Sequence, residues 1–189
     1  MNEINFVKKL ALWVFIIPFI ATNSCLLLVT VFGEYLPPGI RIGKVFPYFD
    51  GGTSISRTAR NFPAYLIFKP AMIFTSFLLI KYWLITKKIV KNIDYNQQIS
   101  NYFVIFGILS AIFLIVHSIF LGVKFDYDLY KFFRRFVLLA FIVFEIIAQS
   151  LLVHRLFKLK LIISEYFNNY VLILKIILVS ILVIVAIGS

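Results

Sequence analysis

The chain has 189 residues, of which 62% are hydrophobic and 18% aromatic, and its formal net charge is +11. Its single cysteine, Cys25, excludes an intramolecular disulfide, and no Cys/His spacing typical of a metal or cofactor site occurs, so neither is predicted. The positive charge does not indicate a nucleic-acid partner, because the Lys and Arg residues flank apolar runs and line no soluble face or arm.

Five long apolar runs follow one another along the chain. A helix needs about 20 predominantly apolar residues to cross the hydrocarbon core of a bilayer. The runs predict five transmembrane helices, over residues 10–32, 63–86, 102–122, 136–153 and 170–187. The stretch 156–167 mixes lysines with Leu and Ile, which favours an interfacial amphipathic helix or an extension of the neighbouring spans. We therefore expect an all-α, polytopic transmembrane bundle forming one domain over residues 1–189.

Five spans place the two termini on opposite sides of the membrane. Basic residues divide equally between the sides, so the positive-inside rule does not decide the orientation. Lys8 and Lys9 precede the first span, and the Gly/Pro-rich loop 34–62 is typical of an external loop. These features predict an integral membrane protein with a cytoplasmic N-terminus. Its richness in Phe, Ile, Lys, Asn and Tyr fits an AT-rich genome and suggests a bacterial inner membrane.

The loops 34–62 and 123–135 lie on the same side in this topology. Each combines carboxylates with arginines, and arginine is suited to holding a phosphate. This pattern predicts a lipid head-group site formed by Arg57, Arg60, Arg134, Arg135 and Lys69. The plainer interpretation is a surface turn in one loop and, in the other, the aromatic belt expected where a chain leaves the bilayer.

Ionisable side chains within the spans require an explanation, because burying a charge at membrane depth is costly. His117 and Glu145 lie below the same predicted surface, so we expect them to approach each other and to face the bundle interior. The alternative is that they serve as interhelical hydrogen-bonding groups. Lys81 and Lys175 lie near the inner ends of their spans and are explained by snorkelling, without a function.

The motif at residues 46–53, Phe-Pro-Tyr-Phe-Asp-Gly-Gly-Thr, is followed shortly by Phe62-Pro63 at the start of a helix. This stretch, together with His117 in a later span, resembles the first external loop and a later histidine of the Frag1/DRAM/Sfk1 family. It departs from the family at Phe49, where a serine is usual. The resemblance implies an integral membrane protein linked to lipid handling, such as remodelling of lipid anchors.

Three functions remain open from the sequence. The leading hypothesis is a small membrane protein that binds or senses lipids or partner helices without catalysing a reaction. The first alternative is a lipid-modifying enzyme in which His117 acts as general base and an acid orients it; the candidate acids are Asp50, Asp126 and Glu145. The second alternative is an accessory subunit of a larger membrane complex. The expected partners are anionic membrane lipids and other membrane subunits.

Overall fold

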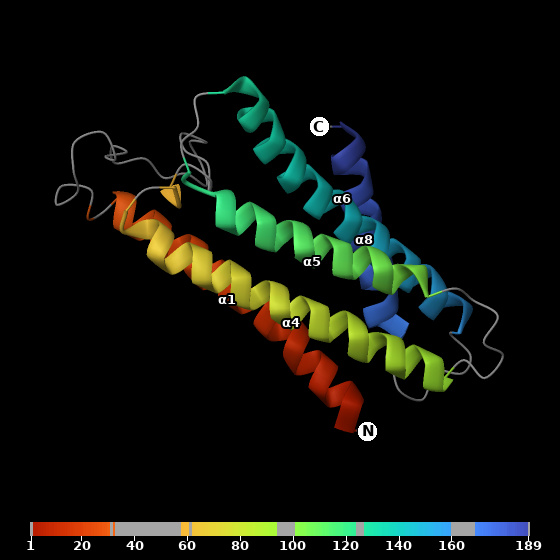
Figure 1. Ribbon diagram of the computed structural model, residues 1–189. Coiled ribbons are helices and arrows are strands. Elements are labelled where there is room, and N and C mark those ends of the chain that lie inside the picture. Colours follow the sequence, from red (N-terminus) through yellow and green to blue (C-terminus); the bar gives the residue numbers. More distant parts are fainter. Residues whose placement is uncertain are drawn as a thin grey trace.

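The computed structural model describes residues 2–30, 32, 58–60, 62–93, 101–123, 127–159 and 169–188. The helices within these residues are α1 (Asn2–Thr30), α4 (Ala64–Ile93), α5 (Tyr102–Phe120), α6 (Asp128–Lys158) and α8 (Asn169–Gly188), as Figure 1 shows. Four of them are long and apolar enough to cross a membrane, and α8 is a shorter apolar helix over its described side chains. The predicted all-α membrane bundle is therefore confirmed.

Three of the helices continue beyond the apolar runs that predict them. α1 already includes Lys8 and Lys9, α4 runs on through Lys91, and α6 begins at Asp128, two turns before its apolar run. The hydrogen bonds of a helical backbone do not depend on side-chain polarity, so a helix need not stop where the hydrocarbon does. The polar ends place charged side chains in the interface. The residues 156–158 of the predicted interfacial segment belong to α6.

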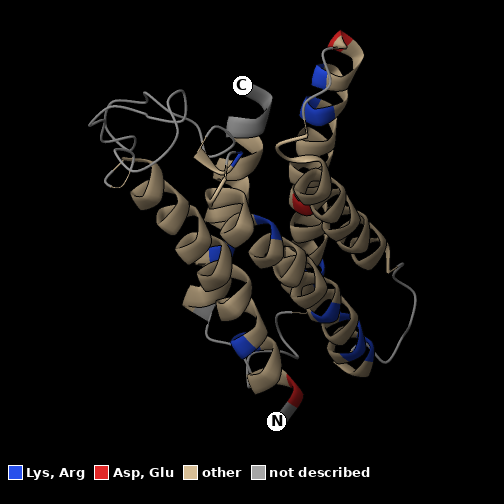
Figure 2. Cartoon of the chain, turned by 60° about the vertical axis from the view of Figure 1, so that its left-hand side comes forward, with Lys and Arg blue, Asp and Glu red and all other residues tan. Residues whose placement is uncertain are grey.

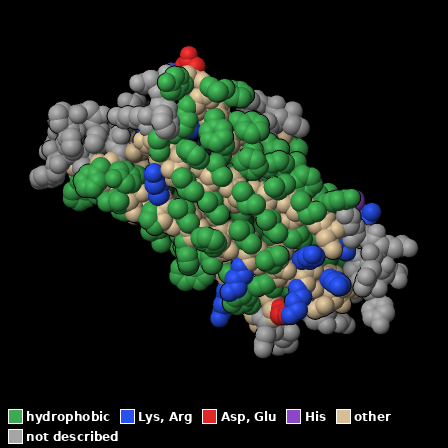
Figure 3. All heavy atoms as spheres, viewed as in Figure 1, with side chains coloured by type: hydrophobic (Ala, Val, Ile, Leu, Met, Phe, Trp, Pro, Cys, Tyr) green, Lys and Arg blue, Asp and Glu red, His purple; other side chains and the backbone are tan. Residues whose placement is uncertain are grey.

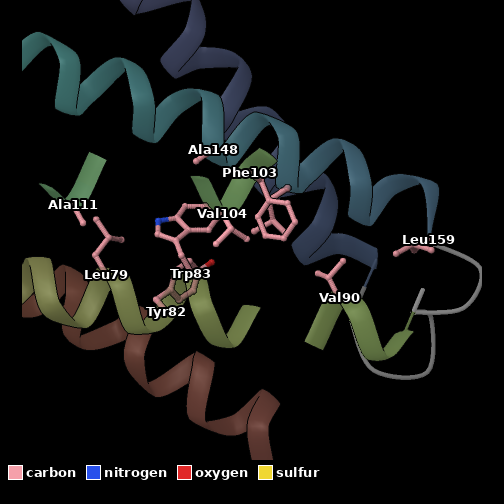
Figure 4. Close-up of a cluster of buried hydrophobic side chains, with 10 residues drawn as sticks. Leu79, Tyr82, Trp83, Val90, Phe103, Val104, Ala111, Ala148 and Leu159 are labelled. Carbon is pink, nitrogen blue, oxygen red and sulfur yellow. The ribbon is translucent and has the colours of Figure 1, made fainter. Parts of the chain in front are cut away.

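Each helix packs mainly against its neighbour in sequence. α1 lies along α4, α4 along α5, and α5 along α6, while α8 crosses α6 at the edge of the bundle (Figure 1). The centre of the bundle is built around Trp83 of α4, which is completely buried and points toward α5 and α6 (Figure 4). Its ring packs against Tyr82 and Phe103, and the backbone of Gly107 lies directly against the indole.

Side-chain contacts fasten the end of the bundle where α1 begins. Lys88 of α4 forms a salt bridge with Glu3 of α1. Arg155, near the end of α6, is buried and donates from Nη1 to Oδ1 of Asn101, 3.1 Å away, just before α5. These contacts join α1 to α4 and α5 to α6 at this end. Exposed lysines also gather here: Lys8, Lys9, Lys81, Lys87, Lys88, Lys91 and Lys158.

The surface between the two ends of the bundle is apolar. Figure 3 shows hydrophobic side chains covering the middle of the visible face, with basic groups toward its ends. Many large apolar side chains of α1, α4, α6 and α8 are exposed there. Figure 2 shows that basic positions gather toward the end that holds the N-terminus, while others lie near the opposite end. This is the charge distribution of a chain whose middle lies in hydrocarbon.

Candidate functional site

Side chains from two other helices meet the last turn of α5. The last carbonyl groups of a helix lack partners within the helix, and positive charge is favourable beside them. Nζ of Lys69 in α4 donates to the Ile119 carbonyl at 3.2 Å, and the Tyr130 hydroxyl of α6 donates to the Phe120 carbonyl at 2.8 Å. We call residues 117–122 and the side chains around them the α5 junction.

The segment 58–60 closes the α5 junction from the side of α4. Thr58 and Ala59 are buried, and the backbone oxygen of Arg60 lies 2.7 Å from the point where a Cβ of residue 122 would stand. Gly122 has φ 84°, a conformation that favours glycine. The Cys25 thiol of α1 donates to the Ala64 carbonyl at 3.3 Å and fixes the start of α4. Arg60 is thereby held beside the end of α5.

Arg134 of α6 reaches the same junction. Its guanidinium carbon lies 6.0 Å from the centre of the Tyr130 ring, whose hydroxyl donates to the Phe120 carbonyl at the end of α5. Nε of Arg134 is buried and has no hydrogen-bond partner in the described part of the chain. Arg135, the next residue, is exposed. The two adjacent arginines therefore differ: Arg134 faces the protein and Arg135 faces its surroundings.

An apolar groove of about 690 Å³ adjoins Arg134 on the first turns of α6. Its lining residues are all large and apolar or aromatic: Tyr127, Leu129, Tyr130, Phe132, Phe133 and Phe136. Tyr130 is shared between the two features, because its ring lines the groove and also lies beneath the Arg134 guanidinium. A cationic group and an apolar groove are thus next to each other at one end of the bundle.

Glu145 is part of a separate polar cluster in the middle of the bundle. Its Oε2 accepts from the Ser110 hydroxyl of α5 at 2.6 Å, and its Oε1 accepts from Nε2 of Gln149 at 2.9 Å. The cluster therefore joins α5 to α6 in the middle of the bundle.

The structure does not bring His117 and Glu145 together. Glu145 bonds to Ser110, which precedes His117 by seven residues, or about 10 Å along α5. Arg134, a charged residue near His117, is a poor orienting partner for a general base, and the other candidate acids, Asp50 and Asp126, lie outside the described residues. The expectation that both side chains face the interior is confirmed, since His117 is buried and Glu145 has polar partners on α5 and α6.

The other sequence-predicted site residues have mixed outcomes. Arg60, Lys69 and Arg134 each lie beside the α5 junction, whereas Arg135 is exposed. Three further candidates lie outside the described residues: Asp50, Arg57 and Asp126.

Sequence reasoning missed the contact that Tyr130 makes with the end of α5. Tyr130 could not be separated from the other aromatic residues of its loop.

No three His, Cys, Asp or Glu side chains come together as metal ligands within the described ranges. Comparison with protein-family models gives no match for this chain, and neither curated proteins nor solved structures give one.

Proposed function

We propose that the protein binds the phosphate head group of an anionic lipid at the α5 junction. The observation that carries this proposal is that three basic residues from separate segments, Arg60, Lys69 and Arg134, each lie beside the end of α5 or the tyrosine bonded to it. The end of α5 needs only part of this positive charge, because Lys69 and Tyr130 already donate to its final carbonyls. The N–H groups of the Arg134 guanidinium are therefore not required by the last carbonyls of α5 and can bind a phosphate.

The chemistry of Arg134 and the adjoining groove fits a lipid better than a soluble anion. Arginine presents a planar fork of donors that matches two phosphate oxygens at once. The aromatic groove beside Arg134 offers an apolar surface for the acyl chain of a lipid. The groove lies on the first turns of α6, where the polypeptide would enter the membrane. Within the described residues the enzyme alternative has less support, because His117 lies near the cation Arg134 and apart from Glu145.

Arg134→Ala should weaken retention of an anionic lipid about tenfold or more, because charge-assisted hydrogen bonds contribute about 1.5 to 3 kcal/mol each. Arg134→Lys should restore only part of the affinity, since lysine lacks the fork. Arg135→Ala is the matched control, being the same substitution one position further along α6 at an exposed site. Native mass spectrometry during titration with phosphatidylglycerol, and with phosphatidylcholine for comparison, measures the effect. Equal losses for the two alanine variants would contradict the proposal, and no loss in either would favour the accessory-subunit interpretation.

We further propose that the end of the bundle where α1 begins faces the cytoplasm of a bacterial cell. The exposed lysines of α1, α4 and α6 lie at that end. At the other end, Lys69 donates to α5, Arg134 lies over the Tyr130 ring, and Lys131 is bonded to Asp128. Among the described residues, more exposed basic side chains therefore lie at the N-terminal end than at the other, where Lys131 and Arg135 are exposed, and this favours the N-terminal end as the one that contacts the anionic inner leaflet.

Single cysteines test this orientation on a Cys25→Ser background, in which the hydroxyl retains a donor for the Ala64 carbonyl. Asn5 and Tyr127 are exposed and lie at opposite ends of the bundle. In intact cells, a membrane-impermeant maleimide should label Tyr127→Cys directly, and Asn5→Cys only after the membrane is permeabilised. The reverse pattern would show that the chain is inserted the other way round.

A further inference from the structure

Glu145 differs from the other carboxylates of the described residues, which are Glu3 and Asp128. Those two lie in the first turns of their helices, and each forms a salt bridge with a lysine. Glu145 lies about 20 Å or more from either end of α6, and its hydrogen-bond partners are the neutral side chains of Ser110 and Gln149. An ionised carboxylate at this depth is costly, so the number of hydrogens around it becomes informative.

The Ser110 hydroxyl has one hydrogen and two acceptors within reach. Its Oγ lies 2.6 Å from Oε2 of Glu145 and 2.8 Å from the carbonyl oxygen of Gly107, three residues earlier in α5. A hydroxyl donates one hydrogen bond and accepts two, and oxygen atoms at these separations need a hydrogen between them. While Glu145 is ionised, one of the two contacts therefore lacks a hydrogen. A proton on Oε2 supplies it, because the carboxyl then donates to Ser110 and Ser110 donates to Gly107.

The surroundings of Glu145 also fit a carboxyl that holds a proton. Ser110 is completely buried, so its hydroxyl cannot exchange either partner for solvent. Within the described part of the chain, no salt bridge joins Glu145 to a basic side chain. The ionisable groups on the helices around it are Tyr82 of α4, His117 of α5 and Lys175 of α8. His117 lies about 10 Å from Ser110 along α5, and Lys175 is the cation whose influence the experiment below has to separate.

We propose that Glu145 and Ser110 form a proton-binding site in the middle of the membrane-spanning bundle. The proton comes from water and forms an O–H bond at Oε2, which removes a charge that hydrocarbon disfavours. Ser110 serves both states, because its hydroxyl donates to Oε2 when Glu145 is ionised and to the Gly107 carbonyl when the carboxyl is the donor. Oε1 remains an acceptor for Gln149 in either state. The site therefore takes up and releases a proton without losing a hydrogen bond to Glu145.

Infrared spectroscopy of the purified protein in detergent tests this site, because the C=O stretch of a protonated carboxyl is separate from the bands of carboxylates and amides. At neutral pH the parent protein should show such a band. Glu145→Gln should remove it, whereas the matched control Glu3→Gln, at a carboxylate bonded to Lys88, should leave it in place. Ser110→Ala should move the band to higher frequency, since the carboxyl loses its acceptor. Raising the pH should convert the band reversibly into carboxylate absorption.

Lys175→Gln distinguishes the proton site from an ionised carboxylate that the lysine compensates. The band should be present in the parent and remain in this variant. A band that is absent from both proteins, or that appears only in Lys175→Gln, would overturn the proposal. So would a band that survives Glu145→Gln, or one that persists at every pH at which the protein stays folded. If Glu145→Gln does not fold, a ¹³C label in the side-chain carboxyl, introduced by cell-free synthesis, makes the same assignment in the parent: labelled glutamate should shift the band and labelled aspartate should not.

Discussion

Gly107→Ala is expected to lower the stability of the bundle by about 3 kcal/mol or more, at the upper end of the range for overpacked cores. A Cβ at this position would lie far inside contact distance of three ring atoms of Trp83. The indole has no room to move, because it is completely buried and packed against Tyr82 and Phe103. Thermal unfolding in detergent, followed by the circular dichroism of the helices, measures the loss.

The same substitution in a Trp83→Leu background separates the steric effect from other causes. Leucine leaves space opposite residue 107, so Gly107→Ala should cost much less there than in the parent chain. Equal costs in both backgrounds would mean that the contact of Gly107 with Trp83 does not set the distance between α4 and α5.

The fold could be predicted from the sequence because a bilayer requires every backbone polar group to be hydrogen-bonded within the protein. A chain in hydrocarbon must satisfy its backbone internally, so an apolar run such as 102–122 has to be helical, and α5 spans Tyr102–Phe120. The ends of α4 and α6 were harder to predict from the sequence, because a charged segment next to an apolar run can either continue the helix or form a loop. At Lys87 and Arg134 the composition is that of a loop, and the structure is helical at both.

The candidate site was predictable only in part, because depth in the membrane does not determine which side chains meet. His117 and Glu145 were paired from their distances to one surface, which ignores the register of the two helices. α5 and α6 run antiparallel, so residues at similar distances from their connection are neighbours. Phe113 packs against Phe136, and Phe120 against Tyr130. The same register places His117 near Arg134 and Glu145 near Ser110.

The arginines and lysines of the α5 junction illustrate the same limit. From charge and position alone, the sequence predicts the same role for Lys69 and Arg135, which is binding of a lipid head group. The Lys69 ammonium is engaged by the Ile119 carbonyl, whereas Arg135 is exposed. Which basic side chain is held by the protein depends on the rotation of its helix, and apolar periodicity is weak where both lipid and protein surround a helix.

Gly122→Ala should displace Arg60 from the α5 junction while leaving the rest of the bundle folded. The substitution has two costs: an L-residue pays about 1 to 2 kcal/mol in the left-handed region, and the new Cβ would stand 2.7 Å from the Arg60 carbonyl oxygen. Because that oxygen belongs to the backbone, segment 58–60 has to move. A cysteine at position 58, buried in the parent, reports this movement through its reaction with a thiol reagent on the Cys25→Ser background.

Gly122→Asn separates the two costs of this substitution. Asparagine tolerates the left-handed region but still carries a Cβ, so the clash with Arg60 remains while most of the conformational penalty is removed. Thr58→Cys should therefore become reactive in both the Ala and the Asn variants, and lipid retention should fall in both if Arg60 contributes to the head-group site. Reactivity in the Ala variant alone would show that backbone conformation, and not contact with Arg60, is what requires glycine. A cysteine that stays protected in both variants would mean that segment 58–60 is held independently of Gly122.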